Sequence, residues 1–481
     1  MDGRGIRFGH IGTNRKNLEI MRISAKITFL LMIIALSMMT SAATLDRPAL
    51  QELPPSNVYL PFVTNQYPLT TRFGVDGKWS LDKMKSAGVT WLRLTKQLNW
   101  SVIGAVEGAD PDWSKAADVD AILIDAAQKG LKPILVIQNA PTWAQKYPGS
   151  VCGPIREDKL SAFGDFLYKV VERYSKPPYN VTYYQIWNEP DTFANTAATV
   201  YGCWGEYADS TNGGSFYGTM LAQVYPQIKA ANPDAQLVMG SLMLNCNPLD
   251  PKSDCSYPYK FFDGVLQTAG GAFDAVMFNS GTSYDAGKNP VWLEKNNWRW
   301  TNAFGGLVDG KIHYLRNAMA AYGIDRPIIH SEAYFLDRTS ENFNVFENQK
   351  ADYLVWVNAN GWSQNLKAVI WYSIEGWKGS ELINTGGTET LAYQALKTMS
   401  GLLQKSELIS RNDLGGYTHF IFRTIGQDIW LLVPTGETHG TTYSISKPAN
   451  FKRAVDIYGV EQAISGETIE FNRPFYVIVN Q

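Results

Sequence analysis

Short strand-forming runs alternate with longer helical segments along most of this 481-residue chain. The runs are rich in β-branched and aromatic residues, whereas the segments between them repeat their apolar residues with the 3.6-residue period of a helix. The predicted strands cover residues 71–75, 90–94, 133–137, 182–187, 236–240, 273–278, 327–331 and 368–371. Eight such strands over about 340 residues match the count of a (β/α)8 barrel. The pattern therefore predicts an α/β fold with a (β/α)8 TIM barrel over residues 67–405.

The predicted helices lie between these strands and after the last one. They cover residues 81–87, 119–129, 159–174, 216–231, 312–322, 350–360 and 391–403. Nearly continuous apolar strands are expected when helices cover one face of a parallel sheet and a barrel core fills the other. An open doubly wound sheet is the alternative, but no glycine-rich phosphate-binding turn follows the first strand. The barrel is therefore the preferred interpretation.

From Gly415 onward the helical period is lost. Short alternating runs occur instead at residues 417–422, 429–433, 442–445, 454–456 and 474–479, separated by turns such as Thr435-Gly436. We expect a small antiparallel, sandwich-like β domain over residues 412–481 that docks on the barrel. The apolar stretch 57–63, within a linker over residues 44–66, is a candidate extra strand of this domain. Its default role is structural, with sugar binding as the alternative.

The amino terminus has the pattern of a secretory signal peptide. Residues 27–43 carry no charge, Arg22 and Lys26 precede them, and Ser41 and Ala43 are the small residues expected before a cut after Ala43. The apolar core of about 13 residues is shorter than the roughly 20 that span a bilayer. We therefore predict a signal peptide over residues 1–43, with Met21 as the alternative start and an uncleaved anchor as the alternative reading. The protein is expected to be secreted or extracytoplasmic, with cell-surface attachment open and no stable membrane insertion.

The charge and the cysteine content of the chain limit which ligands, cofactors and disulfides can be expected. The chain has 43 Lys and Arg against 45 Asp and Glu, which argues against nucleic acid as a partner. A mildly acidic exported protein favours neutral substrates over acidic polymers. Export also allows disulfides. Cys246 and Cys255 lie close together in one loop-like stretch and are expected to pair, which leaves Cys152 to pair with Cys203. No C-x-x-C motif is present, which disfavours a zinc site and a thioredoxin-like redox site. No metal or organic cofactor is predicted.

The active site of such a barrel lies at the carboxyl ends of its strands. Two carboxylates stand at these positions, Glu189 after the fourth strand and Glu332 after the seventh. Cleavage of a glycosidic bond needs one protonated carboxyl group at the leaving oxygen and one ionised carboxylate at the anomeric carbon. The other polar or aromatic residues at strand exits are Arg93, Gln138, Asn139, Trp143, Asn279, Tyr284 and Trp371.

Each of these residues also has a structural interpretation. A single Glu at a strand end is often an ion-pair partner, and Glu375 is a rival for the second carboxylate. Asp191 reads as a loop-capping residue, and Arg93 could simply neutralise a buried acid. The aromatic residues could be core or rim packing, although 15 Trp and 25 Tyr in one chain also suit a cleft that stacks on sugars.

The tetrapeptide Trp187-Asn188-Glu189-Pro190 after the fourth strand resembles the acid/base strand of clan A glycoside hydrolases, which include family 39 β-xylosidases and family 5 endoglucanases. The resemblance implies that Glu189 is the general acid/base and that Asn188 binds the sugar 2-hydroxyl. It also implies that Glu332, in the segment IIHSEAY, is the nucleophile. The implied reaction is double displacement with retention, with the two carboxyl groups about 5–5.5 Å apart.

Smaller elements are similar to the same clan. The resemblance implies that Trp143 is an aromatic cleft element, that Arg93 lies near the nucleophile and that Trp371 is a sugar platform; Trp204 is a further stacking candidate. Many relatives carry a His followed closely by a Tyr at the sixth strand, whereas here Asn279 is followed by Tyr284. Tyr284 is the candidate partner of Glu332, and Asn279 is expected to contact substrate.

The implied partner is an oligo- or polysaccharide. The chain has no G-x-S-x-G elbow, no H-E-x-x-H motif and no Walker A motif, so other hydrolase classes are disfavoured. A non-catalytic glycan-binding barrel and a transglycosylase that uses the same two carboxylates remain as alternatives. The sequence leaves open which glycoside is bound and whether action is endo or exo.

Overall fold

The structure is a computed structural model that describes residues 72–193, 202–250 and 258–481. The predicted signal peptide over residues 1–43, the linker over residues 44–66 and the candidate strand at 57–63 lie outside the described residues.

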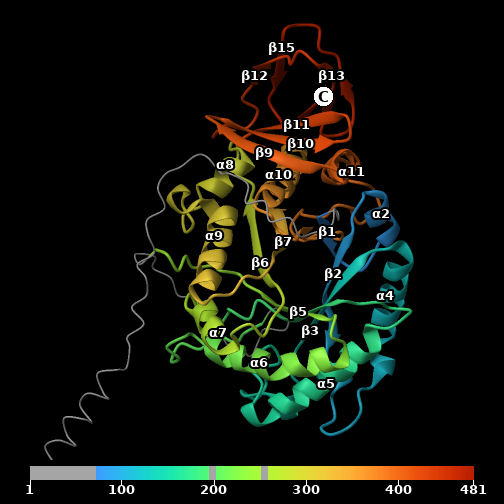
Figure 1. The fold of residues 1–481 in the computed structure, drawn as a ribbon, viewed down its shortest axis with the longest axis vertical. Coiled ribbons are helices and arrows are strands. Elements are labelled where there is room, and N and C mark those ends of the chain that lie inside the picture. The colour runs from blue at the N-terminus through green and yellow to red at the C-terminus, as the bar shows by residue number, and fades with distance from the viewer. Residues whose placement is uncertain (1–71, 194–201, 251–257) are drawn as a thin grey trace, which may run out of the picture. The chain divides into compact units, whose positions relative to one another are not determined.

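Eight parallel strands of the described chain form the barrel predicted from the sequence (Figure 1). Their order is β5-β4-β3-β2-β1-β8-β7-β6, and the parallel bridges Val238–Ala275 and Leu242–Phe278 join β5 to β6 at the seam. The strands are β1 (Phe73–Asp76), β2 (Trp91–Asn99), β3 (Lys132–Gln138), β4 (Tyr183–Asn188), β5 (Gln236–Ser241), β6 (Val276–Ser283), β7 (Ile328–Leu336) and β8 (Ala368–Trp371). Each overlaps with a predicted strand, which confirms the fold class, although β2, β6 and β7 run past their predicted ends at 94, 278 and 331.

Helices surround these strands and bury their apolar faces against them (Figure 1). They are α2 (Leu81–Ser86), α3 (Trp100–Ile103), α4 (Ala117–Lys129), α5 (Leu160–Tyr174), α6 (Gly214–Ala231), α7 (Phe261–Ala269), α8 (Pro290–Lys295), α9 (Gly306–Ala321), α10 (Phe343–Ser363) and α11 (Leu391–Leu403). Short 3-10 helices lie at Trp113–Ala116, Thr142–Ala144, Glu157–Lys159 and Asn302–Phe304. The sequence prediction does not include α3, α7 and α8.

The barrel interior is apolar at its amino end. One cluster there is built from strand residues and the loop residue Ala275: Trp91, Ile134, Val238, Ala275, Met277, Ile329, Ala368 and Ile370. Side chains two positions apart on a strand point to the same face. The next inward residue after Trp91 on β2 is therefore Arg93, and the next after Tyr183 on β4 is Gln185. An apolar floor thus lies beneath a polar layer at the carboxyl ends.

The carboxyl-terminal part is an antiparallel β domain. A sheet of order β14-β13-β16-β11-β10-β9 faces a smaller pair, β12-β15. The strands are β9 (Glu407–Leu414), β10 (Tyr417–Thr424), β11 (Gln427–Pro434), β12 (Tyr443–Ser446), β13 (Phe451–Asp456), β14 (Glu461–Gln462), β15 (Thr468–Phe471) and β16 (Phe475–Asn480). Alternation decides which way each side chain points: Leu431 and Val433 on β11 join the large core shared with the barrel, whereas Leu432 packs with β15.

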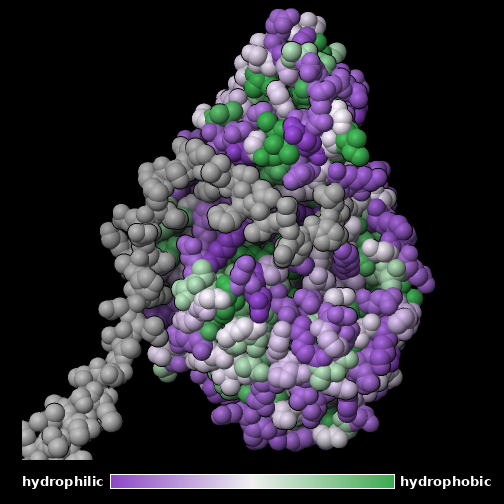
Figure 2. All heavy atoms as spheres, in the orientation of Figure 1, coloured by the Kyte–Doolittle hydropathy of each residue, from purple (hydrophilic) through white to green (hydrophobic). Residues whose placement is uncertain are grey.

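Polar side chains cover most of the face viewed in Figure 2, and hydrophobic side chains form small groups on it. Among the described helices, none is long and apolar enough to cross a membrane.

Candidate active site

Arg93 is the centre of the polar layer at the carboxyl ends of the strands. It is completely buried, and all five of its guanidinium N–H groups have partners. Nε donates to Gln185 (2.9 Å), Nη1 to Asp76 (3.0 Å) and Glu332 (2.7 Å), and Nη2 to Asn188 (2.6 Å) and Ser241 (3.2 Å). One guanidinium therefore ties together the ends of five strands, β1, β2, β4, β5 and β7.

Glu332 reaches this layer through an irregularity in β7. The register of β7 shifts between His330 and Ala333 against β8, and β6 shifts between Phe278 and Asn279 against β7. Such bulges re-aim side chains and are frequent next to active sites. Glu332 is 8% exposed and accepts the charge-assisted hydrogen bond from Arg93. The sequence prediction that Arg93 lies beside Glu332 is thus met by a direct contact.

The Trp187–Pro190 segment ends β4 in an unusual conformation. Trp187 has a φ of 65° and Glu189 a φ of 49°, left-handed values that bulky residues rarely adopt. The Trp187 indole donates to the Cys152 carbonyl at 2.8 Å, and the Glu189 N–H donates to the Ser241 carbonyl at 2.9 Å. These contacts hold the strained turn, and strain of this kind clusters at functional sites.

The two carboxyl groups influence each other but have different surroundings. Burial, and then the charge of Glu332, raises the pKa of Glu189 to about 8, against the opposing effects of Asn279 and Arg93. Glu189 Oε1 accepts from Asn279 Nδ2 at 2.7 Å, a neutral donor, whereas Glu332 faces a guanidinium. A carboxyl group with a raised pKa next to a carboxylate paired with a guanidinium can supply one acid and one carboxylate at the same pH.

The two predicted asparagines both lie in this layer. The Asn188 side-chain oxygen is taken by Arg93, which leaves the amide nitrogen as its group for donating to a ligand. Asn279 accepts from the Ser331 hydroxyl at 2.8 Å, and this fixes its amide nitrogen toward Glu189. Asn279 therefore contacts the predicted acid/base directly.

Several residues of the site were missed by sequence reasoning. Asp76, Gln185 and Ser241 hold Arg93, and they could have been found as polar residues on otherwise apolar inward positions. Tyr334 and Tyr372 also face the carboxylates, whose charge adds to burial in raising the pKa of both phenols. Tyr334 stands two residues after Glu332 on β7, over Gly281 of β6, where a Cβ would clash with its ring.

The structure places Tyr284 away from its predicted position. The Tyr284 ring packs near Phe346, with 6.3 Å between ring centroids, and its backbone N–H bonds the Leu336 carbonyl. Within the described residues no hydrogen bond links Tyr284 to Glu332. The tyrosines beside the two carboxylates are Tyr334 on β7 and Tyr372 after β8, rather than Tyr284 after β6.

The predicted aromatic platforms are largely enclosed. Trp371 is 1% exposed and donates its indole N–H to the Ser380 carbonyl, so a sugar could stack on it only after neighbouring residues move. Trp204 is equally buried, against Trp187. Trp143 is half-buried, bonds the Gly104 carbonyl at 3.3 Å and packs edge-on against Trp100.

Two other tryptophans are exposed on loops that follow barrel strands. Trp79, after β1, is 60% exposed, and Trp377, after β8, is 53% exposed. Glu375, the rival carboxylate, joins these loops, because its Oε1 accepts from the backbone N–H groups of Lys78 (3.2 Å) and Trp79 (3.0 Å). Glu375 thus has the structural role of a turn cap.

A disulfide joins Cys152 in the loop after β3 to Cys203 in the loop after β4, as predicted. The Cys203 N–H also bonds the Cys152 carbonyl at 3.2 Å. The predicted partner of Cys246 is Cys255, which lies outside the described residues, so that pairing stays a prediction. Asp191 caps the loop after β5, as expected, by accepting from the N–H groups of Met243 and Leu244.

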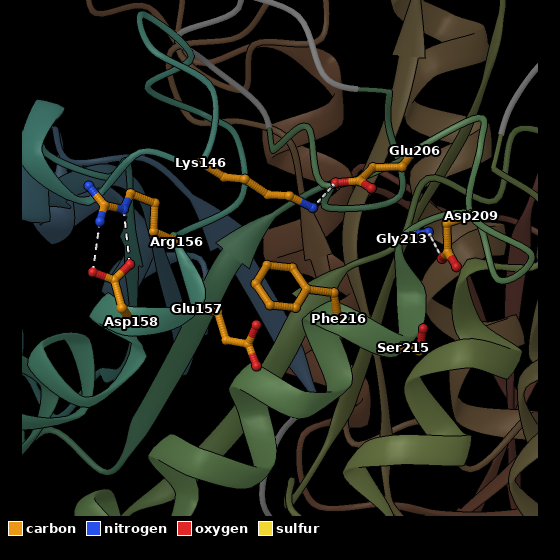
Figure 3. Close-up of a pocket in the computed structure, with 9 residues that line it drawn as sticks. All are labelled: Lys146, Arg156, Glu157, Asp158, Glu206, Asp209, Gly213, Ser215 and Phe216. Atoms are coloured by element: carbon orange, nitrogen blue, oxygen red, sulfur yellow. Dashed lines mark hydrogen bonds and ion pairs between the residues drawn. The ribbon is translucent and has the colours of Figure 1, made fainter.

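A surface hollow of about 390 Å³ lies elsewhere on the barrel (Figure 3). Lys146 crosses it, paired with Glu206 at 2.6 Å and 4.9 Å from the ring of Phe216. None of the predicted site residues lines this hollow. In the part of the chain that the structure describes, no group of three His, Cys, Asp or Glu side chains could hold a metal ion.

No family model and no curated protein matches the chain. Solved structures do match it. The chain is similar to a family 39 glycoside hydrolase from the gut symbiont Bacteroides cellulosilyticus WH2, with a TM-score of 0.63 at 19% identity, covering 86% of this chain and 81% of that one. It is similar to a family 30 subfamily 8 xylanase from Clostridium acetobutylicum, with a TM-score of 0.54 at 13% identity and coverage of 86% and 97%. It is also similar to a conserved exported protein from Bacteroides fragilis, with a TM-score of 0.60 at 13% identity and coverage of 86% and 98%. The chain therefore shares its fold with clan A glycoside hydrolases of families 39 and 30.

Proposed function

We propose that the chain is a retaining glycosidase that hydrolyses O-glycosidic bonds by double displacement. The observation that carries the proposal is the contrast between its two carboxyl groups. Glu332 is held by the buried guanidinium of Arg93, whereas burial raises the pKa of Glu189 to about 8. A nucleophile must be ionised and a general acid protonated, and these environments favour that division.

In the first step, Glu332 attacks the anomeric carbon of the sugar. The bond from that carbon to the leaving oxygen breaks, and the proton of Glu189 passes to the leaving oxygen. The product is a glycosyl ester on Glu332. The loss of one negative charge at Glu332 then lowers the pKa of Glu189, because the charge of Glu332 is one of the causes that raises it.

In the second step, Glu189 is the base. It takes a proton from water, whose oxygen attacks the anomeric carbon and releases Glu332 as a carboxylate. Two inversions at one carbon give net retention. Asn188 donates its amide N–H to the hydroxyl next to the anomeric carbon, and Arg93 keeps Asn188 and Glu332 in fixed relation. A transglycosylase would use the same steps with a sugar in place of water.

The solved structures of similar fold support this class of reaction. One is described as a family 39 glycoside hydrolase, another as a family 30 xylanase, and a third as a β-xylosidase from Caulobacter crescentus. We take an oligo- or polysaccharide as the partner. Trp79 and Trp377 offer the exposed flat faces on which further sugar units can stack.

Aryl glycosides with good leaving groups test the two roles. Glu189→Ala and Glu332→Ala are each expected to lose activity by several orders of magnitude. Azide should rescue Glu189→Ala with a product of retained configuration, because it attacks the glycosyl ester. It should rescue Glu332→Ala with inverted configuration, because it attacks the substrate directly. Glu375→Gln, which keeps a turn-capping oxygen, is the matched control and should stay active.

The same experiment separates the alternatives. Full activity in Glu189→Ala or Glu332→Ala would refute the assignment. Saturable glycan binding by the wild type without any cleavage product would identify a binding protein instead. Transfer products that dominate at high sugar concentration would identify a transglycosylase.

Chain-length dependence tests the exposed tryptophans. Trp79→Ala and Trp377→Ala should raise KM for oligosaccharides roughly 2- to 10-fold, as expected for the loss of about 0.5–1.5 kcal/mol of ring stacking, and leave KM for an aryl monosaccharide unchanged. Tyr322→Ala, at an exposed ring between α9 and β7 on the opposite end of the barrel, is the control. Equal effects on both substrate classes would contradict the assignment.

We also propose that the protein is exported. The Cys152–Cys203 disulfide suits an oxidising compartment, and one protein of similar fold is described as exported. Expression of the full chain in a secreting bacterial host should give extracytoplasmic protein that begins at Thr44. Intact protein retained in the cytoplasm would contradict this.

A further inference from the structure

Lys311 is a buried lysine that the proposed reaction does not use. It lies on α9, is 3% exposed, and extends its amine toward the carboxyl ends of two strands. Nζ donates to the Met243 carbonyl after β5 at 2.7 Å and to the Asn279 carbonyl on β6 at 2.9 Å. A buried lysine is costly unless its charge and its donors find partners, so this position needs an explanation.

Both carbonyl groups belong to residues that hold acids of the site. Asn279 donates its amide to Glu189 Oε1 at 2.7 Å. The Met243 N–H donates to Asp191 at 2.9 Å, and Asp191 stands two residues after Glu189. Asn279 thus connects the amine of Lys311 to Glu189, and Met243 connects it to Asp191.

The charged groups around Lys311 are mainly acidic. Asp191, Glu189 and, from α8, Glu294 favour its protonated form, whereas Arg299 opposes it. From β7, His330 is buried and bonds the Ser280 carbonyl; burial lowers its pKa to about 3, so it is neutral. Burial lowers the pKa of Lys311 to about 7. Burial also raises the pKa of Asp191 to about 6, and the nearby Lys311 partly opposes this rise.

We propose that Lys311 is a positioning residue: by holding the Asn279 and Met243 carbonyls, it fixes the Asn279 amide against Glu189. The proposal rests on the proposed function only for calling Glu189 the acid/base. When Glu189 gives its proton to a leaving group, a buried negative charge appears beside Asp191. The Asn279 amide N–H then donates to that charge, and Lys311 holds the Asn279 backbone in place.

Two variants separate the effect of the Lys311 charge from the effect of its hydrogen bonds. Lys311→Met removes both in a side chain of similar length. Lys311→Gln removes the charge and keeps N–H donors, and it also serves if the methionine variant does not fold. The readout is the titration of the Glu189 carboxyl by 13C NMR of glutamate-labelled protein, with its resonance assigned by loss in Glu189→Gln. We expect the pKa of Glu189 to rise by up to about 1 unit in Lys311→Met, because the hydrogen bond from Asn279 that lowers this pKa loses its support, and to rise less in Lys311→Gln, which keeps N–H donors.

Lys350 provides a matched control. It is also completely buried on a helix, α10, and its Nζ donates to the carbonyls of Gly379 and Glu381 and to Glu347 at 2.8–2.9 Å. Lys350→Met should lower Tm and leave the titration of Glu189 unchanged. An equal shift in Lys350→Met would show a general effect of unpairing a buried lysine and would overturn the proposal.

The activity profile gives a second readout. If the chain is a glycosidase, the basic limb of kcat/KM should move to higher pH in Lys311→Met and Lys311→Gln by the same amount as the NMR titration. An unchanged Glu189 pKa in a folded Lys311 variant overturns the inference. Absence of any glycosidase activity in the wild type would refute the proposed function, whereas a shifted Glu189 titration would still support the coupling to Lys311.

Discussion

Arg93 is the residue on which the geometry of the site depends. Its five N–H groups are used by five different side chains, and two of these, Asn188 and Glu332, are expected to touch substrate. A guanidinium is suited to this position because its donors diverge in a plane and it stays charged when buried. An ammonium could not reach the same set.

Arg93→Lys should therefore be damaging although it keeps the charge. It leaves buried partners such as Asp76 and Gln185 without their donors, and breaking a buried pair costs about 3–5 kcal/mol. We expect a lower free energy of unfolding in guanidinium titrations and a loss of at least about 100-fold in kcat/KM, because Glu332 and Asn188 lose their fixed relation. Wild-type kinetics in a destabilised variant would show that Arg93 serves the fold alone.

The raised pKa of Glu189 sets the direction of pH effects. A carboxyl group with a pKa of about 8 is protonated below that pH, so the general acid is present there and kcat/KM should fall as pH rises through about 8. A rate profile that is flat from pH 7 to 9.5 would contradict this.

The same group makes stability depend on pH. Between the ordinary value for glutamate, about 4.3, and about 8, the folded protein binds a proton that the unfolded chain does not. Stability therefore falls as pH rises through this window. Glu189→Gln removes the contribution, and its Tm should fall less between pH 5 and pH 8 than that of the wild type. Parallel Tm curves for the two proteins would argue against the raised pKa.

At the level of elements, the catalytic strands depend on the loops that follow them. The disulfide joins the loops after β3 and β4, and the Cys152 carbonyl accepts the indole N–H of Trp187, which precedes Asn188 and Glu189. The position of Glu189 is thereby connected to a covalent link between two loops.

Removal of this link should lower stability. The double variant Cys152→Ser/Cys203→Ser is expected to lose about 2–4 kcal/mol of unfolding free energy, as for disulfides that close loops of this order. Guanidinium unfolding of both proteins under non-reducing conditions measures the difference. The same midpoint in both would mean that hydrogen bonds and packing alone hold the two loops.

The strand count and the end of β4 are predictable from the sequence because apolar period and strand-exit position are local properties, whereas β7 continues to Leu336, past its predicted end at 331. The neighbours of Glu332 are not predictable in this way. A bulge in β7 decides that Tyr334 rather than Tyr284 faces the carboxylates, and bulges leave no clear trace in composition. Lys311 reads as an ordinary lysine at the start of a helix predicted from residue 312, yet α9 begins at Gly306 and buries it.

At the scale of the whole molecule, the β domain and the barrel share one core. Side chains on one face of its larger sheet belong to the same apolar cluster as the barrel helices. Ionic contacts add to this packing: Arg473, before β16, bonds Asp352 on α10 at 2.8 Å and Asn348 at 2.7 Å. A shared core predicts that barrel and β domain unfold together.

Arg473→Ala should lower stability by roughly 1.5–3 kcal/mol, since Asp352 loses its charge-assisted hydrogen bonds from Arg473 and keeps the contact with His439. Calorimetry should still give one transition, at a lower Tm. Arg423→Ala is the matched control, because Arg423 pairs with Asp428 within the β domain at an exposed position, and its Tm should equal that of the wild type. Two separate transitions in Arg473→Ala would indicate that the two parts are held together mainly by this contact.

The sequence by itself determined the (β/α)8 barrel, the β domain and the two strands, β4 and β7, after or on which Glu189 and Glu332 lie. These follow from periodicity and spacing, which act over a few residues. Only the tertiary structure decided which side chains meet at the barrel mouth. It buries Trp371, exposes Trp79, and gathers Asp76, Gln185 and Ser241 around Arg93, because strands distant in the chain become neighbours only when the barrel closes.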